Sequence, residues 1–173
     1  IEKGSPFNSS IIWLHGFGAD NNDFKSMAEV LSIPAGKKIR FIFPNAPLRP
    51  ITMSQGHLMR AWYDLKNLTR GAIEDQQAVG ESVDGIHQLM AREHERGVPY
   101  ENMILAGFSQ GGAIALLSGT ICKHKIGGII ALSTYYPHYS LLDKNSFQTN
   151  LDTPILMCHG SLDLIVPMFI GEK

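Results

Sequence analysis

Short apolar runs recur along the chain and predict buried strands. They lie at residues 10–14, 39–43, 103–106, 128–132 and 154–158. Runs of this length, without alternating polar residues, are typical of strands covered on both faces of a sheet. Pro44 directly follows the second run and ends that strand.

Apolar residues at a spacing of three or four predict helices between these strands. The clearest pattern spans about residues 75–96, with charged residues including Glu93 on the other faces and Gly97-Val98-Pro99 at its end. Its apolar stripe consists of Val79, Val83, Ile86, Leu89 and Met90. A shorter helix is expected to run to about Leu31, with an N-cap among residues 20–23. Another helix is expected after residue 109, because residues 112–117 are small or helix-compatible.

The alternation of strands and helices predicts an α/β fold with a mostly parallel sheet and helices on both faces. We expect one domain over residues 1–173. Residues 44–71 are rich in Pro, Gly and Met and predict a long irregular excursion, which inside a compact domain is usually functional. Active sites in such folds gather at the carboxyl ends of strands. His15, Ser109, Ser133 and His159 each follow a predicted strand there.

Composition restricts the possible partners. The net charge is −1 and there is no basic block, so nucleic acid and anionic membrane surfaces are not expected as partners. No apolar run approaches the length of a membrane span. Two distant cysteines indicate free thiols and a reducing, cytoplasmic location, although the start at Ile1 leaves a removed signal peptide open. The seven histidines match no metal-binding spacing, so no metal is expected.

The segment Gly107-Phe108-Ser109-Gln110-Gly111 fits the G-x-S-x-G turn that carries a nucleophilic serine between a strand and a helix. Glycines two residues to either side allow other backbone to pass close to this strained turn. Cys158 is a poorer nucleophile candidate, because it lies inside a predicted strand.

A serine nucleophile needs a base, an orienting acid and an oxyanion hole. Asp163 is the expected acid, because it follows the last predicted strand; Asp152 precedes that strand, and Asp143 lies in a loop of uncertain position. The oxyanion donors are expected to be the backbone N–H groups of Gln110 and Phe17.

Six segments, which run in order over nearly the whole chain, carry a resemblance to a known family. The chain resembles the carboxylesterase, lysophospholipase and acyl-protein thioesterase family of α/β-hydrolases. The segments are Ile12-Trp13-Leu14-His15-Gly16-Phe17-Gly18-Ala19-Asp20, Phe43-Pro44-Asn45-Ala46-Pro47, Met59-Arg60-Ala61-Trp62-Tyr63-Asp64, Leu105-Ala106-Gly107-Phe108-Ser109-Gln110-Gly111-Gly112, Leu132-Ser133-Thr134-Tyr135, and His159-Gly160 through Asp163 to Val166-Pro167.

The resemblance implies an α/β-hydrolase that cleaves carboxylic esters or thioesters through an acyl-enzyme, without metal or cofactor. It implies Ser109 as nucleophile, Asp163 as acid, and Phe17 and Gln110 as oxyanion donors. It also implies an acyl groove near Trp62, and we expect Met59 and Tyr135 to bind substrate there as well. The substrate partner is thus a small-molecule or lipid ester or thioester, and a homodimer is possible.

The resemblance does not extend to the histidine that serves as the catalytic base. The family's histidine follows the acid on a later loop, whereas no histidine follows Asp163 in this chain. We therefore expect a hydrolase domain that lacks its last strand and helix, and that is inactive unless another segment supplies the histidine. Replacement by His15, His159 or another of the seven is a weaker possibility. The alternative function is a non-catalytic protein that binds acyl ligands on a hydrolase fold.

Overall fold

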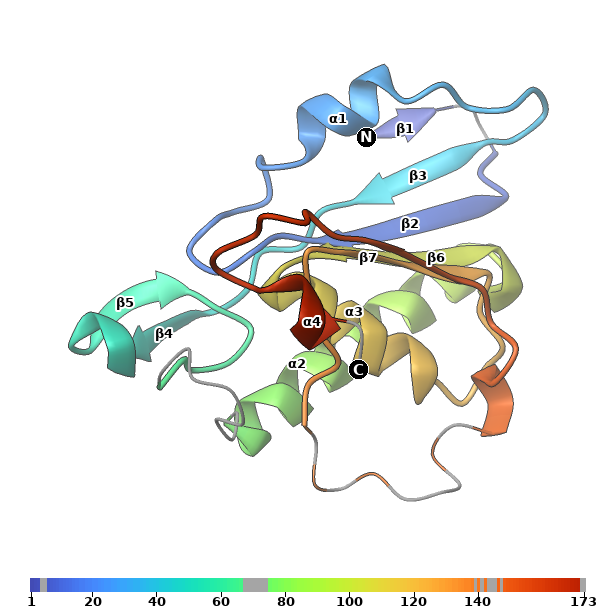
Figure 1. Ribbon diagram of the computed structural model, residues 1–173. Coiled ribbons are helices and arrows are strands. Elements are labelled where there is room, and N and C mark those ends of the chain that lie inside the picture. The colour runs from blue at the N-terminus through green and yellow to red at the C-terminus, as the bar shows by residue number, and fades with distance from the viewer. Residues whose placement is uncertain are drawn as a thin grey trace.

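The computed structural model describes residues 1–3, 6–66, 75–138, 140, 142, 146 and 148–171. Its centre is a six-stranded sheet in the order β1-β3-β2-β6-β7-β8 (Figure 1). Neighbouring strands are parallel, except that β1 pairs antiparallel with β3. The strands are β1 (Glu2–Lys3), β2 (Ser9–Leu14), β3 (Ile39–Ile42), β6 (Met103–Phe108), β7 (Gly128–Leu132) and β8 (Ile155–Cys158). The predicted α/β class is confirmed, and β1 is an addition that its two-residue length concealed.

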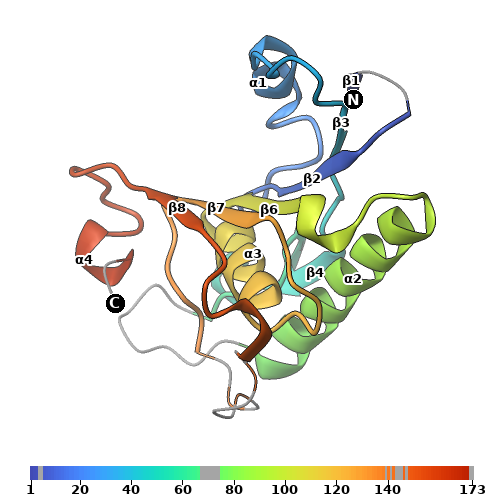
Figure 2. The same cartoon turned by 90° about the vertical axis from the view of Figure 1, so that its right-hand side faces the viewer.

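Helices cover both faces of the sheet (Figures 1 and 2). Helices α2 (Gln76–Glu95) and α3 (Gln110–Thr120) lie on one face, and α1 (Lys25–Val30) lies on the other. Side chains alternate between the two faces along β2: Ile12 and Leu14 enter the core under α2 and α3, whereas Ile11 and Trp13 pack with Ala28 of α1. A last short helix, α4 (Met168–Gly171), follows β8. Single 3-10 turns lie at Thr52–Ser54, Tyr100–Asn102 and Gln148–Asn150.

Helix α2 agrees with its predicted pattern in all but one charged residue. The Asp75 carboxylate accepts a hydrogen bond from the Ala78 N–H and caps the helix. The stripe faces the core, although Leu89 is only half-buried. Glu93, which we expected on a polar face, is buried at 3% exposure and pairs with Arg40 of β3 and with Arg96. The burial pattern of α2 is therefore set partly by an ion pair that spans two elements.

The N-terminus of α1 differs from the expectation. Its N-cap residue is Phe24, and no side chain caps it. Two of the polar residues before it bond locally instead: the Asn22 N–H donates to the Asp20 carboxylate, and the Asn22 side chain accepts from Lys25 at the start of α1. These polar residues signalled a turn rather than a helix cap.

The predicted irregular excursion contains an antiparallel hairpin, so the prediction was wrong for this part. Strands β4 (Leu48–Ile51) and β5 (His57–Arg60) pair from Leu48↔Arg60 to Ile51↔His57. Gln55 and Gly56 adopt positive φ angles of 54° and 82° where the chain turns back. A proline inside β4 hid this strand in the sequence. Residues 67–71 of the excursion lie outside the described residues.

The register of the parallel strands sets the place of the functional segments. Phe108 is the partner of Leu132 in the sheet, and Leu132 is the partner of Cys158. The residues that follow these three therefore leave the sheet on one side, at the carboxyl ends of the parallel strands. The β4–β5 hairpin lies beyond the same strand ends in Figure 1.

Candidate active site

Ser109 occupies a left-handed backbone conformation between β6 and α3. Its φ and ψ angles are 52° and −122°, which a non-glycine residue rarely adopts. Three hydrogen bonds hold the strained residue. The Ser109 N–H donates to the Leu132 carbonyl at 2.9 Å, and the Ser109 carbonyl accepts from the Ala113 N–H at 3.1 Å and from the Thr134 hydroxyl at 2.7 Å. This is the geometry of a sharp strand-to-helix turn that presents a serine side chain at the carboxyl end of a strand.

The glycines around Ser109 permit close backbone approaches. A Cβ on Gly111 would collide with the backbone carbonyl of His15, and one on Gly107 with the carbonyl of Gly111. A Cβ on Gly112 would lie 2.7 Å from the Thr134 Cβ. Helix α3 therefore begins in direct contact with the end of β2, and only residues without a side chain fit at these positions.

The two expected oxyanion donors flank Ser109. Gln110 is the first residue of α3, and the loop that contains Phe17 follows β2. A Cβ built on Gly16 would lie only 3.6 Å from the Ser109 Cβ, so this loop runs directly beside the serine. Within the described part of the chain, neither the Phe17 nor the Gln110 N–H donates to a hydrogen-bond partner. Both groups are therefore available to an anion.

Asp163 lies in the loop after β8, and its carboxylate is fixed by backbone groups. The N–H groups of Val166 and Ile165 each donate to its Oδ1 at 2.9 Å. These two bonds hold the pKa of Asp163 below its usual value, with smaller contributions from His159 and from the Ser133 hydroxyl. At neutral pH the group is thus an ionised acceptor, as an orienting acid must be.

Two histidines that directly follow strands of the sheet are hydrogen-bonded to backbone groups. The buried His15 ring bonds the Gly16 carbonyl through Nδ1 at 2.7 Å, and its Nε2 accepts from the Ala46 N–H at 3.0 Å. His159 Nε2 donates to the Val166 carbonyl at 2.6 Å and lies 3.8 Å from Asp163 Oδ2. Both rings fix their own loops, and neither is hydrogen-bonded to Ser109.

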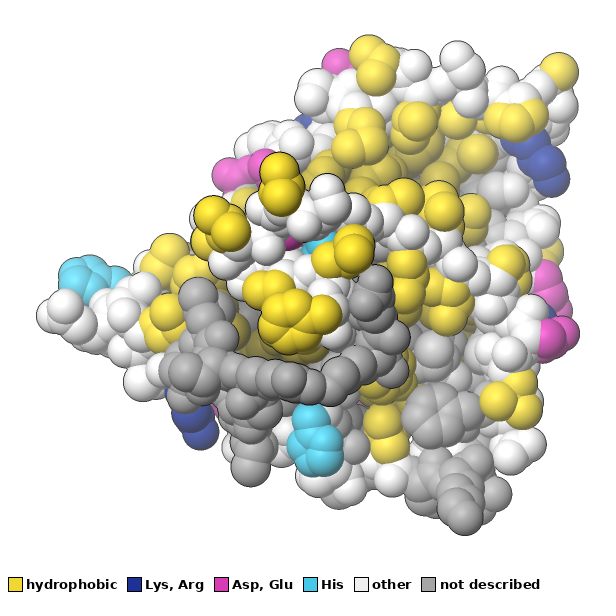
Figure 3. Space-filling model, in the orientation of Figure 1, with side chains coloured by type: hydrophobic (Ala, Val, Ile, Leu, Met, Phe, Trp, Pro, Cys, Tyr) yellow, Lys and Arg dark blue, Asp and Glu magenta, His cyan; other side chains and the backbone are white. Residues whose placement is uncertain are grey.

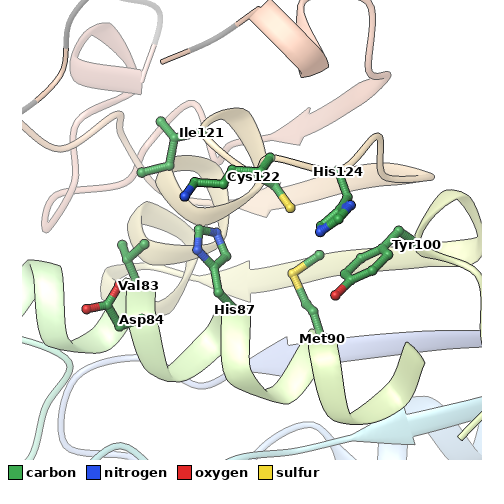
Figure 4. A pocket seen from close by; sticks show the side chains of 9 residues that line it. Val83, Asp84, His87, Met90, Tyr100, Ile121, Cys122 and His124 are labelled. Atoms are coloured by element: carbon green, nitrogen blue, oxygen red, sulfur yellow. The ribbon is translucent and has the colours of Figure 1, made fainter. Parts of the chain in front are cut away.

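Three other histidines lie at the opposite end of α3 from Ser109. His87 and His124 line a cavity of about 430 Å³ between α2 and the turn after α3 (Figure 4). Tyr100 stacks between His124 and His94, at ring distances of 4.1 and 4.6 Å. Because the eleven residues of α3 span about 16 Å, this cavity is remote from Ser109.

The remaining two histidines also bond elsewhere. His57 bonds the Ser54 carbonyl in the hairpin, and the carbonyl of the exposed His138 accepts from Gln76. Among the described residues, therefore, no histidine is hydrogen-bonded to Ser109. The structure places the loop of Phe17 directly beside Ser109 and holds the Asp163 carboxylate in the loop after β8.

The three expected substrate-binding residues differ in their placement. Trp62 is only 4% exposed, and its indole N–H donates to the His15 carbonyl at 2.9 Å. This burial leaves little of its ring for an acyl chain. Met59 is half-buried and its terminal methyl lies against Gly18 in the loop that contains Phe17. Tyr135 is half-buried, and its hydroxyl lies 2.8 Å from that of Tyr63.

The alternative candidate residues differ in their placement. Asp152 forms an ion pair with Lys125 before β8, whereas Asp143 lies outside the described residues. Cys158 is exposed within β8, and both it and Cys122 are free thiols. Over the described ranges, no group of three or more His, Cys, Asp or Glu side chains could hold a metal ion. In the same ranges, no helix combines the length and apolarity needed to cross a bilayer.

Sequence reasoning assigned no role to two residues that support the site. Thr134 is fully buried and its hydroxyl bonds the Ser109 carbonyl. Ser133 adopts a positive φ of 44°, and its N–H donates to the Cys158 carbonyl at 2.8 Å. Their position directly after a predicted strand was the available signal. Together they connect the turn of Ser109 to the end of β8.

Comparison with known proteins gives consistent results for sequence and fold. A family model described as phospholipase/carboxylesterase matches residues 1–173. Acyl-protein thioesterase 1 from Yarrowia lipolytica is 34% identical over 99% of this chain and 77% of its own length. The crystal structure of Arabidopsis thaliana SOBER1 matches with a TM-score of 0.84 and 30% identity, over 95% of this chain and 79% of that chain. Zea mays acyl-protein thioesterase 2 matches with a TM-score of 0.83 and 26% identity, over 99% and 79%.

Proposed function

Because the chain belongs to the phospholipase/carboxylesterase family of α/β-hydrolases, we propose that Ser109 is the nucleophile of this serine hydrolase. The family and the thioesterase relatives identify the reaction as cleavage of carboxylic ester or thioester bonds. The observation that carries the assignment of Ser109 is its strained turn, which abuts the loop that contains Phe17. This combination is expected where a nucleophile and an oxyanion hole must share one carbonyl group.

In the proposed mechanism, Ser109 Oγ attacks the carbonyl carbon of the substrate while its proton passes to a base, which later gives that proton to the leaving group, and the carbonyl oxygen becomes an oxyanion. The N–H groups of Phe17 and Gln110 stabilise this charge, and each such donor typically contributes about 3 kcal/mol in the transition state. Collapse of the intermediate releases the alcohol or thiol, which takes up a proton, and leaves an acyl group on Ser109. Water then attacks the ester, releases the carboxylic acid and restores the hydroxyl.

The base of this reaction is proposed to come from outside the described residues. The two histidines at the carboxyl ends of the strands, His15 and His159, each bond the backbone of their own loop or of a neighbouring loop. Asp163 would orient an imidazole that approaches Ser109, because its carboxylate is ionised and rigidly held. Without that imidazole, the serine hydroxyl is a weak nucleophile, and loss of a catalytic histidine costs about 10⁶ in kcat in another serine hydrolase.

The substrate class is proposed to be an acyl ester or thioester, as the names of the thioesterase relatives suggest. Met59 and Tyr135 are proposed to contact the acyl group, because both are half-buried on the side of the sheet where the strands end and Ser109 lies. The second candidate function, non-catalytic binding of acyl ligands, is supported by the engagement of the described histidines elsewhere. The two candidates differ in whether Ser109 forms a covalent adduct.

The cellular setting is proposed to be cytoplasmic, on the ground that Cys122 and Cys158 are free thiols. Imaging of the tagged protein in its own cells tests this location, and a secreted pool would contradict it. A homodimer is proposed through the outer edge of β8, because its Ile155, Leu156 and Met157 side chains are 45–56% exposed.

Covalent labelling tests the assignment of Ser109. We expect a fluorophosphonate probe to label the chain slowly in buffer and at least tenfold faster when imidazole is added, because imidazole supplies the missing base. Mass spectrometry should locate the adduct on Ser109, and Ser109→Ala should remove it. Rapid labelling without imidazole would contradict a base outside the described residues. No adduct on Ser109 at any imidazole concentration would contradict the hydrolase mechanism and favour the acyl-binding alternative.

A further inference from the structure

The two oxyanion donors belong to segments that are far apart in the sequence, and their relative position needs a structural cause. Phe17 lies in the loop after β2, whereas Gln110 begins α3. Catalysis by such donors depends on positions that are set before the reaction begins. A displacement of about 1 Å in a catalytic geometry can cost about 10²-fold in rate.

The direction of the Phe17 N–H is set through the Gly16 carbonyl, because the two groups belong to one peptide unit. In a planar trans peptide, the carbonyl and the N–H point in opposite directions. The Gly16 carbonyl accepts from His15 Nδ1 at 2.7 Å and from the Ala19 N–H at 3.2 Å. These bonds turn the Phe17 N–H away from the loop interior, which leaves it free for an anion.

The His15 ring is in turn fixed on two sides. Its Nε2 accepts from the Ala46 N–H at 3.0 Å, so the neutral ring must carry its proton on Nδ1, where it donates to Gly16. The ring also packs against the Trp62 indole, with centroids 5.5 Å apart. The orientation of the Gly16–Phe17 peptide thus depends on the buried His15 ring, which in turn packs against Trp62.

Trp62 connects this loop to both helices on that side of the sheet. Its indole N–H donates to the His15 carbonyl at 2.9 Å, and its backbone N–H donates to Gln110 Oε1 at 2.9 Å. Its own carbonyl accepts from the hydroxyl of Ser82 in α2 at 2.5 Å. One buried residue therefore bonds the segment of each oxyanion donor and the longest helix.

The Gln110 side chain completes the connection from the other direction. It is 3% exposed, and its Nε2 donates to the Tyr63 carbonyl at 2.8 Å while its Oε1 accepts from Trp62. Both ends of the amide are thus used by the backbone of residues 62 and 63. The same residue offers its backbone N–H to the anion and its side chain to Trp62.

We propose that Trp62 is the positioning residue of the oxyanion hole: it fixes the loop of Phe17 relative to the first turn of α3 through its indole N–H and through the Gln110 side chain. This inference rests on the proposed function, because it assigns Trp62 to the same site. It also replaces the expected role of Trp62 as an acyl-contacting residue, since the buried indole bonds protein rather than facing a ligand.

The chain offers a matched control for this residue. Its other tryptophan, Trp13, has the same exposed fraction of 4%, but its indole N–H is buried with no hydrogen-bond partner in the described part of the chain. Trp62→Phe and Trp13→Phe therefore make the same chemical change at equal burial. Only the first breaks a bond to the oxyanion loop.

Hydrogen exchange tests the positioning role without any need for catalysis. In the wild type, the N–H groups of Gly18 and Ala19 bond the carbonyls of Arg60 and Gly16. We expect Trp62→Phe to accelerate exchange at these two amides by about tenfold or more relative to Trp13→Phe. Amides of β6 should change by the same factor in both variants. Equal exchange at Gly18 and Ala19 in the two variants, or acceleration that is uniform over the molecule, would overturn the proposal.

Probe labelling in the presence of imidazole connects the loop to chemistry. We expect Trp62→Phe to lower the maximal labelling rate of Ser109 by about 10- to 100-fold, with the probe concentration for half-maximal rate unchanged. A residue that contacted the acyl group would instead raise that concentration, which would overturn the positioning role. If even the wild type forms no adduct, the proposed function fails, whereas the exchange comparison still decides the role of Trp62.

Discussion

At the scale of single residues, two serines that follow inner strands of the sheet have positive φ angles, and only the conformation of Ser109 was predictable. Glycines flank Ser109 in the sequence, and they announce a turn through which backbone passes closely. No glycine flanks Ser133, whose φ of 44° is held by a bond to the Cys158 carbonyl. Its conformation is determined by the neighbouring strand, which a local sequence pattern cannot reveal. The same limit applies to Trp62, for which the family resemblance implied a ligand surface, whereas its hydrogen-bond partners make it part of the scaffold.

The acid loop gives a prediction at this scale, based on the pKa of Asp163. Because bonds from Val166 and Ile165 lower this pKa in the folded state, the ionised carboxylate stabilises the fold at pH values above the unfolded pKa of about 3.9. That contribution is lost as the pH falls through the lower folded value. We expect Asp163→Asn to lower the thermal midpoint at pH 7 and to lower it by less at pH 3.

The control for this comparison is Asp84→Asn, which neutralises an exposed carboxylate on α2. Its midpoint should follow the wild type at both pH values. A difference between Asp163→Asn and the wild type that is as large at pH 3 as at pH 7 would show that the loop is stabilised by amide-compatible bonds rather than by charge.

At the scale of elements, helix α2 was predicted well because a regular apolar stripe decides its burial. The β4–β5 hairpin was missed because Pro50 and the surrounding methionines and glycines interrupt any alternating pattern. Glu93 was assigned to the solvent face because a carboxylate is rarely buried unless it is paired. Its partner, Arg40, lies in a different element, so only the assembled sheet shows that this position is internal.

The Glu93 ion pair yields a stability prediction. Glu93→Ala leaves the Arg40 guanidinium, whose side chain is 17% exposed, without this carboxylate. Loss of one partner from a buried pair typically costs 3–5 kcal/mol, and we expect about 3 kcal/mol here because Arg40 also contacts Glu2. For a domain of this size, that corresponds to a decrease of about 6–12 °C in Tm. Calorimetry measures it, with Glu95→Ala as the exposed control on the same helix; equal Tm values for the two variants would refute the structural role of the pair.

At the scale of the whole molecule, the two edges of the sheet differ in character. The order of apolar strands predicted the α/β class, but edge exposure follows from the strand order in space, which the sequence does not state. One edge is β1, with only two residues, both charged. The other edge is β8, whose Ile155, Leu156 and Met157 are 45–56% exposed. Figure 3 shows apolar side chains gathered on this side of the molecule. An uncharged, apolar edge strand is a surface on which another strand can pair.

We therefore expect the 173-residue chain to self-associate through β8. Sedimentation velocity should show a dimer whose fraction rises with concentration, and Leu156→Lys should shift the distribution to monomer because it places charge on the edge strand. Leu58→Lys, at a leucine of β5 with 67% exposure, is the control and should leave the dimer intact. A chain that stays monomeric at all accessible concentrations would contradict pairing at this edge.

The placement of the two tryptophans has an optical consequence. Trp13 lies in the apolar cluster beneath α1, and Trp62 lies in the cluster beneath α2 and α3. The sheet therefore separates two intrinsic fluorophores, one in each layer. Each phenylalanine variant retains a single tryptophan, so its tryptophan emission during denaturation reports one layer alone. Coincident transitions in the two variants would mean that both layers unfold as one cooperative unit, and separate transitions would give the order in which the layers come apart.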